Sequence, residues 1–220
     1  MLISKKKWGQ NFLQDESVLK KIVAAAEIQP DDQVLEIGAG SGNLTFYLAL
    51  SGAKILAVEK DRDLIVRLTN RLKRFKNVAI INRDARFFDY QKLSDYKVVA
   101  NLPYNISSYI LRQLLTQKNQ PQLMVLMLQK EVAEKITTPP GASDRGLLTI
   151  LVKLVSKPRI ILSVSRDKFF PQPQVDSAVV KIIPFRKWNA QTEKLFKFIK
   201  ISEIVCGVEC DCHSGLNSRR

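Results

Sequence analysis

The chain contains 220 residues, 45% of them hydrophobic and 25% charged, as expected for a globular protein with one substantial core. With 35 Lys and Arg residues against 21 Asp and Glu residues, its net charge of +14 favours a polyanionic partner, most simply nucleic acid. No apolar run approaches the roughly 20 residues of a membrane span, and the N-terminus lacks the apolar core of a signal peptide. We therefore expect a cytoplasmic protein with no membrane partner, and the three cysteines, all beyond residue 205, exclude a disulfide framework.

Strands and helices are predicted to alternate along the chain. After a loop at 10–13, we expect in chain order a helix at 15–26, a strand at 34–37, a helix at 44–50, a strand at 54–58, a helix at 62–75, strands at 78–81 and 98–100, a helix at 107–115, a strand at 123–128, and helices at 131–136 and 147–155. Strands at 160–164 and 178–183 follow without an obvious crossover helix between them. This pattern predicts an α/β fold with a mostly parallel, doubly wound sheet that ends in an antiparallel strand.

A glycine-rich turn, residues 38–42, joins the first predicted strand to the helix after it. Glycine lets the backbone approach a ligand closely, and the helix N-terminus can receive the polar end of that ligand. Taken alone, the turn fits a dinucleotide as well as another adenosine-containing cofactor, and it also fits a tight turn without any ligand.

Two carboxylates narrow the choice of ligand. Glu59 ends the second strand, 21 residues after Gly38, where a carboxylate can accept both ribose hydroxyls of an adenosine. Asp84 ends the third strand at the same sheet edge and could accept an adenine amine. The alternatives are a solvated Glu59 paired with Lys60 or Arg62, and an Asp84 that only caps a strand-to-loop turn.

The segment Asn-Leu-Pro-Tyr, residues 101–104, follows the fourth predicted strand, at the edge where open α/β sheets place their chemistry. The Asn101 amide can hold an exocyclic amine, and the Tyr104 ring can stack on a base. Hydride transfer needs neither group, and the sole histidine is His213, near the end of the chain. We find no Ser-His-Asp arrangement, no phosphate-binding loop and no internal metal cluster in the sequence. The segment therefore favours methyl transfer to a nucleobase amine, with S-adenosylmethionine as donor, over a nicotinamide-dependent reaction.

Six stretches carry a resemblance to a known family, and they occur in that family's order between about residues 5 and 185. They are 8–13 (Trp-Gly-Gln-Asn-Phe-Leu), 36–42 (Glu-Ile-Gly-Ala-Gly-Ser-Gly), 58–61 (Val-Glu-Lys-Asp), 101–107 (Asn-Leu-Pro-Tyr-Asn-Ile-Ser), 128–133 (Leu-Gln-Lys-Glu-Val-Ala) and 169–178 (Phe-Phe-Pro-Gln-Pro-Gln-Val-Asp-Ser-Ala). On these residues the chain resembles the bacterial small-subunit ribosomal RNA adenine dimethyltransferases, the KsgA/RsmA family.

The resemblance implies a Rossmann-like S-adenosylmethionine-dependent methyltransferase fold. It also implies dimethylation of the exocyclic amines of two adjacent adenosines near the 3′ end of small-subunit (16S) rRNA, with a role in ribosome biogenesis. The expected cofactor is S-adenosyl-L-methionine. The expected partner is small-subunit rRNA in an immature 30S particle, and we expect the protein to be a monomer without a metal site.

The resemblance also assigns roles to individual residues. The cofactor side of the site is expected to comprise Gln10, Asn11 and Leu13 at the methionine part, Gly38 and Gly40 along the cofactor, Glu59 at the ribose, Asp84 at the adenine and Asn101 between cofactor and target. For catalysis, the Asn101 oxygen and the Leu102 carbonyl are expected to hold the target amine, while Pro103 fixes the backbone. Tyr104 and Phe169 are expected to stack on the two faces of the target base, and the alternative for either ring is packing in the core.

The end of the chain departs from the family, whose members usually continue into a small helical domain. We expect residues 1–186 to form the methyltransferase domain and 187–220 to be a remnant of the helical domain with a disordered tail. A helix is expected to begin near residue 193, and we interpret residues 206–220 as the result of a frameshift or premature end.

The alternative for Cys206, Cys210, Cys212 and His213 is a zinc site, although Cys-x-Cys-His is cramped for that metal. Without the helical domain we expect the cofactor site to survive and RNA binding to weaken. The chain also departs from the family at residues 143–147 (Ser-Asp-Arg-Gly-Leu), where relatives often carry an aromatic residue before the glycine.

Two other functions stay open at this point. One is a large-subunit rRNA adenine methyltransferase of the antibiotic-resistance type, against which the proline-rich stretch 169–178 argues. The other is a non-catalytic RNA-binding ribosome assembly factor that retains the methyltransferase fold. Cofactor binding without methyl transfer to any rRNA would support the second.

Overall fold

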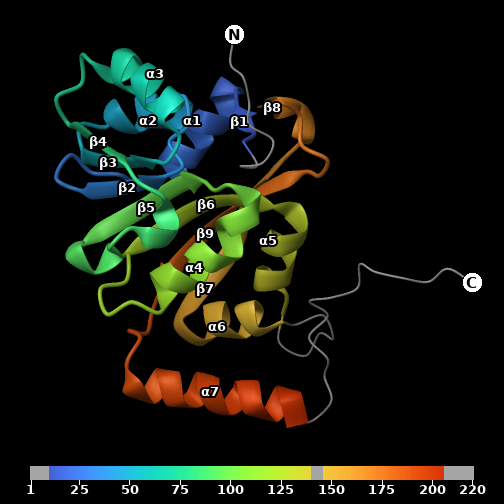
Figure 1. Ribbon diagram of the computed structural model, residues 1–220. Helices are drawn as coiled ribbons and strands as arrows, with labels where there is room; N and C mark the ends of the chain where they lie inside the picture. The colour runs from blue at the N-terminus through green and yellow to red at the C-terminus, as the bar shows by residue number, and fades with distance from the viewer. Residues whose placement is uncertain (1–9, 140–145, 206–220) are drawn as a thin grey trace, which may run out of the picture.

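The computed structural model describes residues 10–139 and 146–205, with side chains up to residue 199. Seven strands form one sheet in the order β4–β3–β2–β5–β6–β9–β7, and helices cover both of its faces (Figure 1). The strands are β2 (Gln33–Ile37), β3 (Lys54–Glu59), β4 (Val78–Asn82), β5 (Tyr96–Asn101), β6 (Leu123–Gln129), β7 (Ser156–Val164) and β9 (Ser177–Pro184). The predictions for residues 8–9, 143–145 and the cysteine-rich end at 206–220 lie outside the described residues.

The five strands β4, β3, β2, β5 and β6 are parallel, and β9 runs antiparallel to both of its neighbours. The predicted mostly parallel α/β sheet with an antiparallel last strand is confirmed. The predicted strand at 160–164 was too short, because β7 begins at Ser156, directly after α6, and pairs with β9 along its whole length with a bulge between Ile160 and Leu162.

The helices form two layers, one on each face of the sheet (Figure 1). One layer contains α1 (Glu16–Ala25), α2 (Asn43–Ala49) and α3 (Arg62–Leu72). Apolar side chains of these helices pack on one face of the sheet, against strand residues such as Val99 and Val125. The other contains α4 (Ser107–Leu115), α5 (Lys130–Thr137) and α6 (Leu147–Val155). Asp15 caps α1, as predicted, by accepting a hydrogen bond from the Val18 N–H at 3.1 Å.

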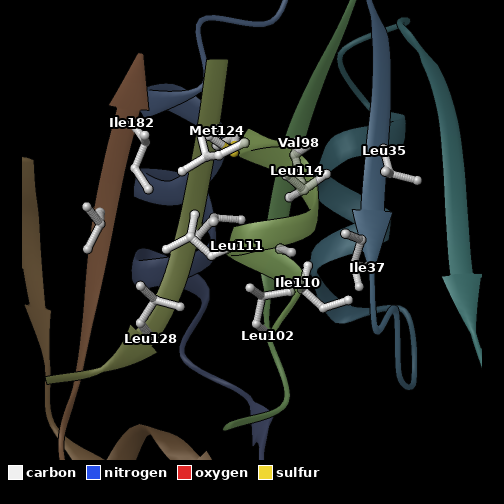
Figure 2. Packing of buried hydrophobic residues seen from close by; sticks show 14 of the residues in the cluster. Leu35, Ile37, Val98, Leu102, Ile110, Leu111, Leu114, Met124, Leu128 and Ile182 are labelled. Atoms are coloured by element: carbon white, nitrogen blue, oxygen red, sulfur yellow. The ribbon is translucent and has the colours of Figure 1, made fainter. Parts of the chain in front are cut away.

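The largest core cluster lies between the sheet and the α4–α6 layer (Figure 2). Strands β2, β5, β6 and β9 and helix α4 supply most of it, including Leu35, Ile37, Val98, Ile110, Leu111, Leu114, Met124, Leu128 and Ile182. Leu102 belongs to the same cluster and is 1% exposed. This packed leucine anchors the segment after β5 to the core, so that its neighbours Asn101 and Pro103 hold fixed positions at the sheet edge.

A second, two-stranded sheet pairs β1 (Phe12–Leu13) with β8 (Phe169–Phe170), antiparallel to each other. The interpretation of residues 10–13 as a loop was therefore wrong for Phe12 and Leu13. Local sequence could not show this pairing, because its partner strand lies more than 150 positions further along the chain. The small sheet brings the beginning and the end of the domain together beside the carboxyl edge of the main sheet.

The chain continues past β9 into α7 (Ala190–Val205), which begins three residues earlier than predicted. Trp188 packs against the main core cluster and makes an edge contact with Phe196 at 6.0 Å between ring centroids. Trp188, which lies just beyond the expected domain boundary at residue 187, thus packs on the core of the methyltransferase domain. Across the described residues, no helix combines the length and the apolar character needed to cross a membrane.

Candidate active site

A cavity opens at the carboxyl edge of the parallel strands, where β2, β3, β4 and β5 each end. Its lining contains all eight residues predicted for the cofactor: Gln10, Asn11, Leu13, Gly38, Gly40, Glu59, Asp84 and Asn101. It also contains Leu102, Pro103 and Tyr104 of the catalytic prediction. One cavity therefore brings together the residues predicted for the cofactor and those predicted for the target base.

The glycine turn adopts a backbone that only glycine takes without strain. Gly38 has φ +74° and Gly40 has φ +60°. A Cβ atom on Gly38 would lie 3.1 Å from the Pro103 ring, and one on Gly40 would lie 3.1 Å from the Phe12 ring. The turn thus fits tightly between the Asn-Leu-Pro-Tyr segment and β1, so a side chain at Gly38 would press on Pro103 and one at Gly40 would press on Phe12.

Glu59 is 7% exposed, and backbone N–H groups hold both of its carboxylate oxygens. Its Oε2 accepts from Gly40 at 2.9 Å, and its Oε1 accepts from Lys60 and Asp61, each at 2.9 Å. Burial raises the pKa of Glu59, and these three hydrogen bonds oppose that rise. The alternative of a solvated Glu59 is excluded by this burial, and the fixed carboxylate borders the cavity as an acceptor.

Asp84 caps the 3-10 helix η2 (Ala85–Phe87) by accepting from the Arg86 N–H at 2.9 Å. Its carboxylate also pairs with the Arg86 guanidinium, at 2.7 Å from Nη2, and this ion pair lowers the pKa of Asp84. The capping alternative for Asp84 is therefore realised in the structure. Because the residue also borders the cavity, the cap and a contact with an adenine amine are compatible.

Glu36 is a member of the site that the sequence analysis did not assign. It stands in β2 just before the glycine turn, is 1% exposed and borders the cavity. Its Oε2 has no hydrogen-bond partner among the residues that the structure describes. Burial raises the pKa of Glu36 to about 8, and the nearby charge of Glu59 adds to that rise. A buried carboxyl group with an unsatisfied oxygen at a cavity wall is an incomplete arrangement that a polar or cationic ligand would complete.

Asn101 is connected to the N-terminal part of the domain. Its Nδ2 donates to the Asn11 carbonyl at 3.2 Å, which orients the side-chain oxygen as the acceptor end of the amide. Gln10, next to Asn11, donates from Nε2 to the Asp61 carboxylate at 3.0 Å. The segment 10–13 therefore spans the cavity from the β3 end to the β5 end, which explains why it borders both halves.

Tyr104 is half-buried, and its hydroxyl lies 2.7 Å from the Ser177 hydroxyl. Burial raises the pKa of the Tyr104 phenol, so the group is neutral at physiological pH. Ser177 begins β9 and is fully buried. The late sequence stretch 169–178 thus contributes to the site through a serine that orients the tyrosine, a role the sequence did not suggest.

Phe169 does not join the cavity. Its ring is 4% exposed and packs in the cluster formed with α1 and α2, which corresponds to the core-packing alternative. Its neighbour Phe170 is 49% exposed, because adjacent residues of a strand point to opposite faces. A contact between Phe169 and a target base would require that ring to leave the core.

Among residues 10–139 and 146–205, no group of three or more His, Cys, Asp or Glu side chains is arranged to hold a metal ion. The residues of the alternative zinc site, Cys206, Cys210, Cys212 and His213, lie outside these ranges.

Comparison with known proteins gives concordant results. A family model described as "Ribosomal RNA adenine dimethylase" matches residues 1–205. The chain is 41% identical to "Ribosomal RNA small subunit methyltransferase A" of Clostridium botulinum over 197 residues, which cover 87% of this chain and 72% of that protein. Among solved structures, a dimethyladenosine transferase from Plasmodium falciparum is similar with a TM-score of 0.74 and 34% identity, covering 88% of this chain and 68% of that one. The 23S rRNA methyltransferase ErmE is similar with a TM-score of 0.78 and 27% identity, covering 90% and 80% of the two chains.

Proposed function

The chain belongs to the ribosomal RNA adenine dimethylase family, and on that premise we propose that it dimethylates the exocyclic amines of two adjacent adenosines in small-subunit rRNA, using S-adenosylmethionine. One observation supports this most directly. The cavity at the sheet edge is bordered on one side by the glycine turn and Glu59, and on the other by the Asn-Leu-Pro-Tyr segment. A donor site and an acceptor site that share one cavity are what direct group transfer requires.

The residues of the cavity fit S-adenosylmethionine. This cofactor supplies an electrophilic methyl group on a positively charged sulfur. Although the chain carries a net charge of +14, three carboxyl groups border this cavity, those of Glu36, Glu59 and Asp84. The Glu36 carboxyl, whose Oε2 has no partner among the described residues, offers a hydrogen-bonding group to the polar part of the cofactor, and Glu59 offers a fixed acceptor for ribose hydroxyls.

The acceptor side fits an aromatic amine. The lone pair of such an amine is delocalised into the ring, so two hydrogen-bond acceptors must turn it toward the methyl group. We propose that the Asn101 Oδ1 and the Leu102 carbonyl are these acceptors. Both are well fixed, since the Asn101 nitrogen is held by Asn11 and the Leu102 side chain is buried in the core. The amine loses its proton to water after methylation, so no strong general base is needed.

The target base must leave its stack to enter this cavity. Tyr104 is the aromatic ring on the acceptor side, and its hydroxyl is anchored on Ser177. We propose that the Tyr104 ring stacks on one face of the target adenine. For Phe169 the family resemblance remains the only argument, because the ring is buried away from the cavity.

The experiment that tests this function is tritiated methyl transfer from S-adenosylmethionine to unmethylated, immature 30S particles, followed by nucleoside analysis. We expect dimethyladenosine in the small-subunit rRNA. A parallel reaction with 23S rRNA separates the large-subunit alternative, which the similarity to ErmE keeps relevant. Binding of the cofactor without methyl transfer to either RNA would reject the proposed activity and support the non-catalytic assembly factor.

A further inference from the structure

An aromatic side chain stands exposed beside the cavity and has no role in the site described above. Phe87 is the last residue of the 3-10 helix η2 and is 67% exposed. The residues that precede it, Arg83, Asp84 and Ala85, all border the cavity. Phe87 is thus an exposed aromatic ring two residues beyond the cavity lining.

The ring of Phe87 is held by contacts on its own loop. The Arg86 guanidinium lies over the ring, 5.5 Å from its centroid, and the Asp84 carboxylate fixes that guanidinium through Nε and Nη2. The Arg83 Nε donates to the Phe87 carbonyl at 3.2 Å. One side of the ring is therefore occupied by a fixed cation, while most of its surface remains accessible.

A second exposed ring lies next to this loop. Tyr109 of α4 is 44% exposed, and its hydroxyl donates to the Arg86 carbonyl at 3.4 Å. Gln113 donates to the same hydroxyl at 3.0 Å and fixes its position. Phe87 lies on the loop after β4, and Tyr109 lies on α4, soon after the Asn-Leu-Pro-Tyr segment. The two exposed rings therefore belong to the segments that form the β4 side and the acceptor side of the cavity.

We propose that Phe87, with Arg86 and Tyr109, forms a platform on which an unpaired nucleobase of the RNA stacks, next to the target adenosine. This inference rests on the proposed function, since a flipped target base requires neighbouring nucleotides that have lost their own stacking partners. Aromatic rings bind bases of any sequence through their π-faces, and an arginine beside the ring adds a cation–π contribution. The platform thus binds the RNA strand that flanks the target and does not select the target base.

The chain contains a matched control for this surface. Phe185 is 52% exposed, and the Arg186 guanidinium lies 5.9 Å from its ring centroid. It follows the end of β9, whose first residue Ser177 contacts Tyr104, so it lies toward the opposite edge of the sheet from the cavity. The two phenylalanines share exposure and an arginine neighbour but differ in their distance from the reaction.

The test is a set of variants in the full chain: F87A, F87L, F87W and F185A. Binding of a fluorescein-labelled single-stranded RNA of about 12 nucleotides is measured at fixed salt, since salt alone changes such affinities. We expect F87A and F87L to bind about tenfold more weakly than wild type, as loss of one base–aromatic stack predicts, while F87W and F185A bind like wild type. The tryptophan fluorescence of F87W, measured against wild type, should fall when the RNA binds.

Kinetics with unmethylated small-subunit particles give the second readout. For F87A we expect a raised KM for the particle with unchanged kcat and unchanged affinity for S-adenosylmethionine. Wild-type RNA affinity in F87A, or an equal loss in F185A, would overturn the platform and leave the proposed function intact. Absence of methyl transfer by the wild-type chain would instead reject the proposed function, while the RNA titration still decides whether the platform binds bases.

Discussion

The two halves of the cavity are held together in different ways. On the cofactor side, backbone groups do most of the work, since three N–H groups within 19 positions of Glu59 fix its carboxylate. On the acceptor side, contacts connect segments that are far apart in sequence. Asn101 reaches Asn11 across 90 positions, and Tyr104 reaches Ser177 across 73. The Glu59 carboxylate is therefore fixed by local chain geometry, whereas the contacts of the acceptor half form only when distant parts of the domain have come together.

The difference teaches which property each half controls. The glycine turn and Glu59 need only β2, β3 and their loops, so the ribose contact proposed for Glu59 depends on a compact part of the sheet. The acceptor side needs β1, β5 and β9 at once, so the orientation of the target amine depends on the complete domain. Changes in the acceptor half should accordingly alter transfer of the methyl group. Changes in the cofactor half should alter binding of S-adenosylmethionine.

The largest separation of the two halves is expected from Asn101→Ala. Removing one of the two acceptors for the target amine should lower methyl incorporation into 30S particles about a hundredfold, because the amine is no longer oriented. Affinity for S-adenosylmethionine, measured by calorimetry, should fall much less than in Glu59→Ala. In that second variant, loss of a charge-assisted acceptor should weaken cofactor binding about tenfold or more.

The control for this comparison is Asn70→Ala, which removes an exposed asparagine from α3 and should change neither quantity. Unfolding by urea should be followed for all three variants, since Glu59→Ala leaves three backbone N–H groups, those of Gly40, Lys60 and Asp61, without their acceptor. Near-wild-type methyl incorporation by Asn101→Ala would show that its amide does not hold the target amine.

An intermediate effect is expected from Glu36, and it appears in the pH dependence of stability. Burial raises the pKa of Glu36 in the folded chain from 4.5 to about 8, so between these values the folded state holds a proton that the unfolded state has lost. The free energy of unfolding should therefore fall as pH rises through this window, by at most about 1.4 kcal/mol per pH unit from this group. Above about pH 8 its contribution should become constant.

The measurement is urea unfolding of the wild-type chain and Glu36→Gln between pH 5 and pH 8. The glutamine keeps the shape of the side chain but cannot ionise, so the stability of the variant relative to wild type should rise with pH. The nearby Glu59 is retained in both proteins, so the difference reports the titration of Glu36 together with its coupling to Glu59. Parallel pH profiles for the two proteins would show that Glu36 is already ionised in the fold.

Local pattern was sufficient for the glycine turn and Glu59, whereas Gln10, Asn11 and Leu13 were expected only from the family resemblance. A glycine turn after a buried strand and an acidic residue at the end of the next strand are visible in sequence, because each depends only on a strand, its end and a short loop. Glu36 also gave a signal that was missed. A charged residue inside the apolar run of residues 34–37 must be buried if that run is a central strand, and a buried carboxyl group calls for a partner.

The acceptor half could be predicted only in part. The position of Asn101 at the end of β5 followed from the strand, but its contact with Asn11 depends on β1, a two-residue strand too short to leave a periodic pattern. Which of Phe169 and Phe170 faces the core depends on the pairing register of β1 and β8. A shift of one residue exchanges the faces, so local sequence could not decide it. Ser177 was visible as a residue of the late stretch, but its contact with Tyr104 arises only from the antiparallel return of β9.

The smallest expected effect concerns that long-range contact between Tyr104 and Ser177. In Ser177→Ala the phenol loses its buried partner, and a neutral hydrogen bond of this kind contributes about 1 kcal/mol, so methyl transfer should fall about fivefold at most. Tyr104→Phe should give a similar loss, because it removes the other side of the same bond and keeps the ring. If the hydroxyl pair only orients the ring, the double variant should be no worse than either single variant, as a double-mutant cycle of methyl-transfer rates would show. Additive losses would mean that the two hydroxyl groups act independently, and the acceptor half would then be less dependent on the return of β9 than its geometry indicates.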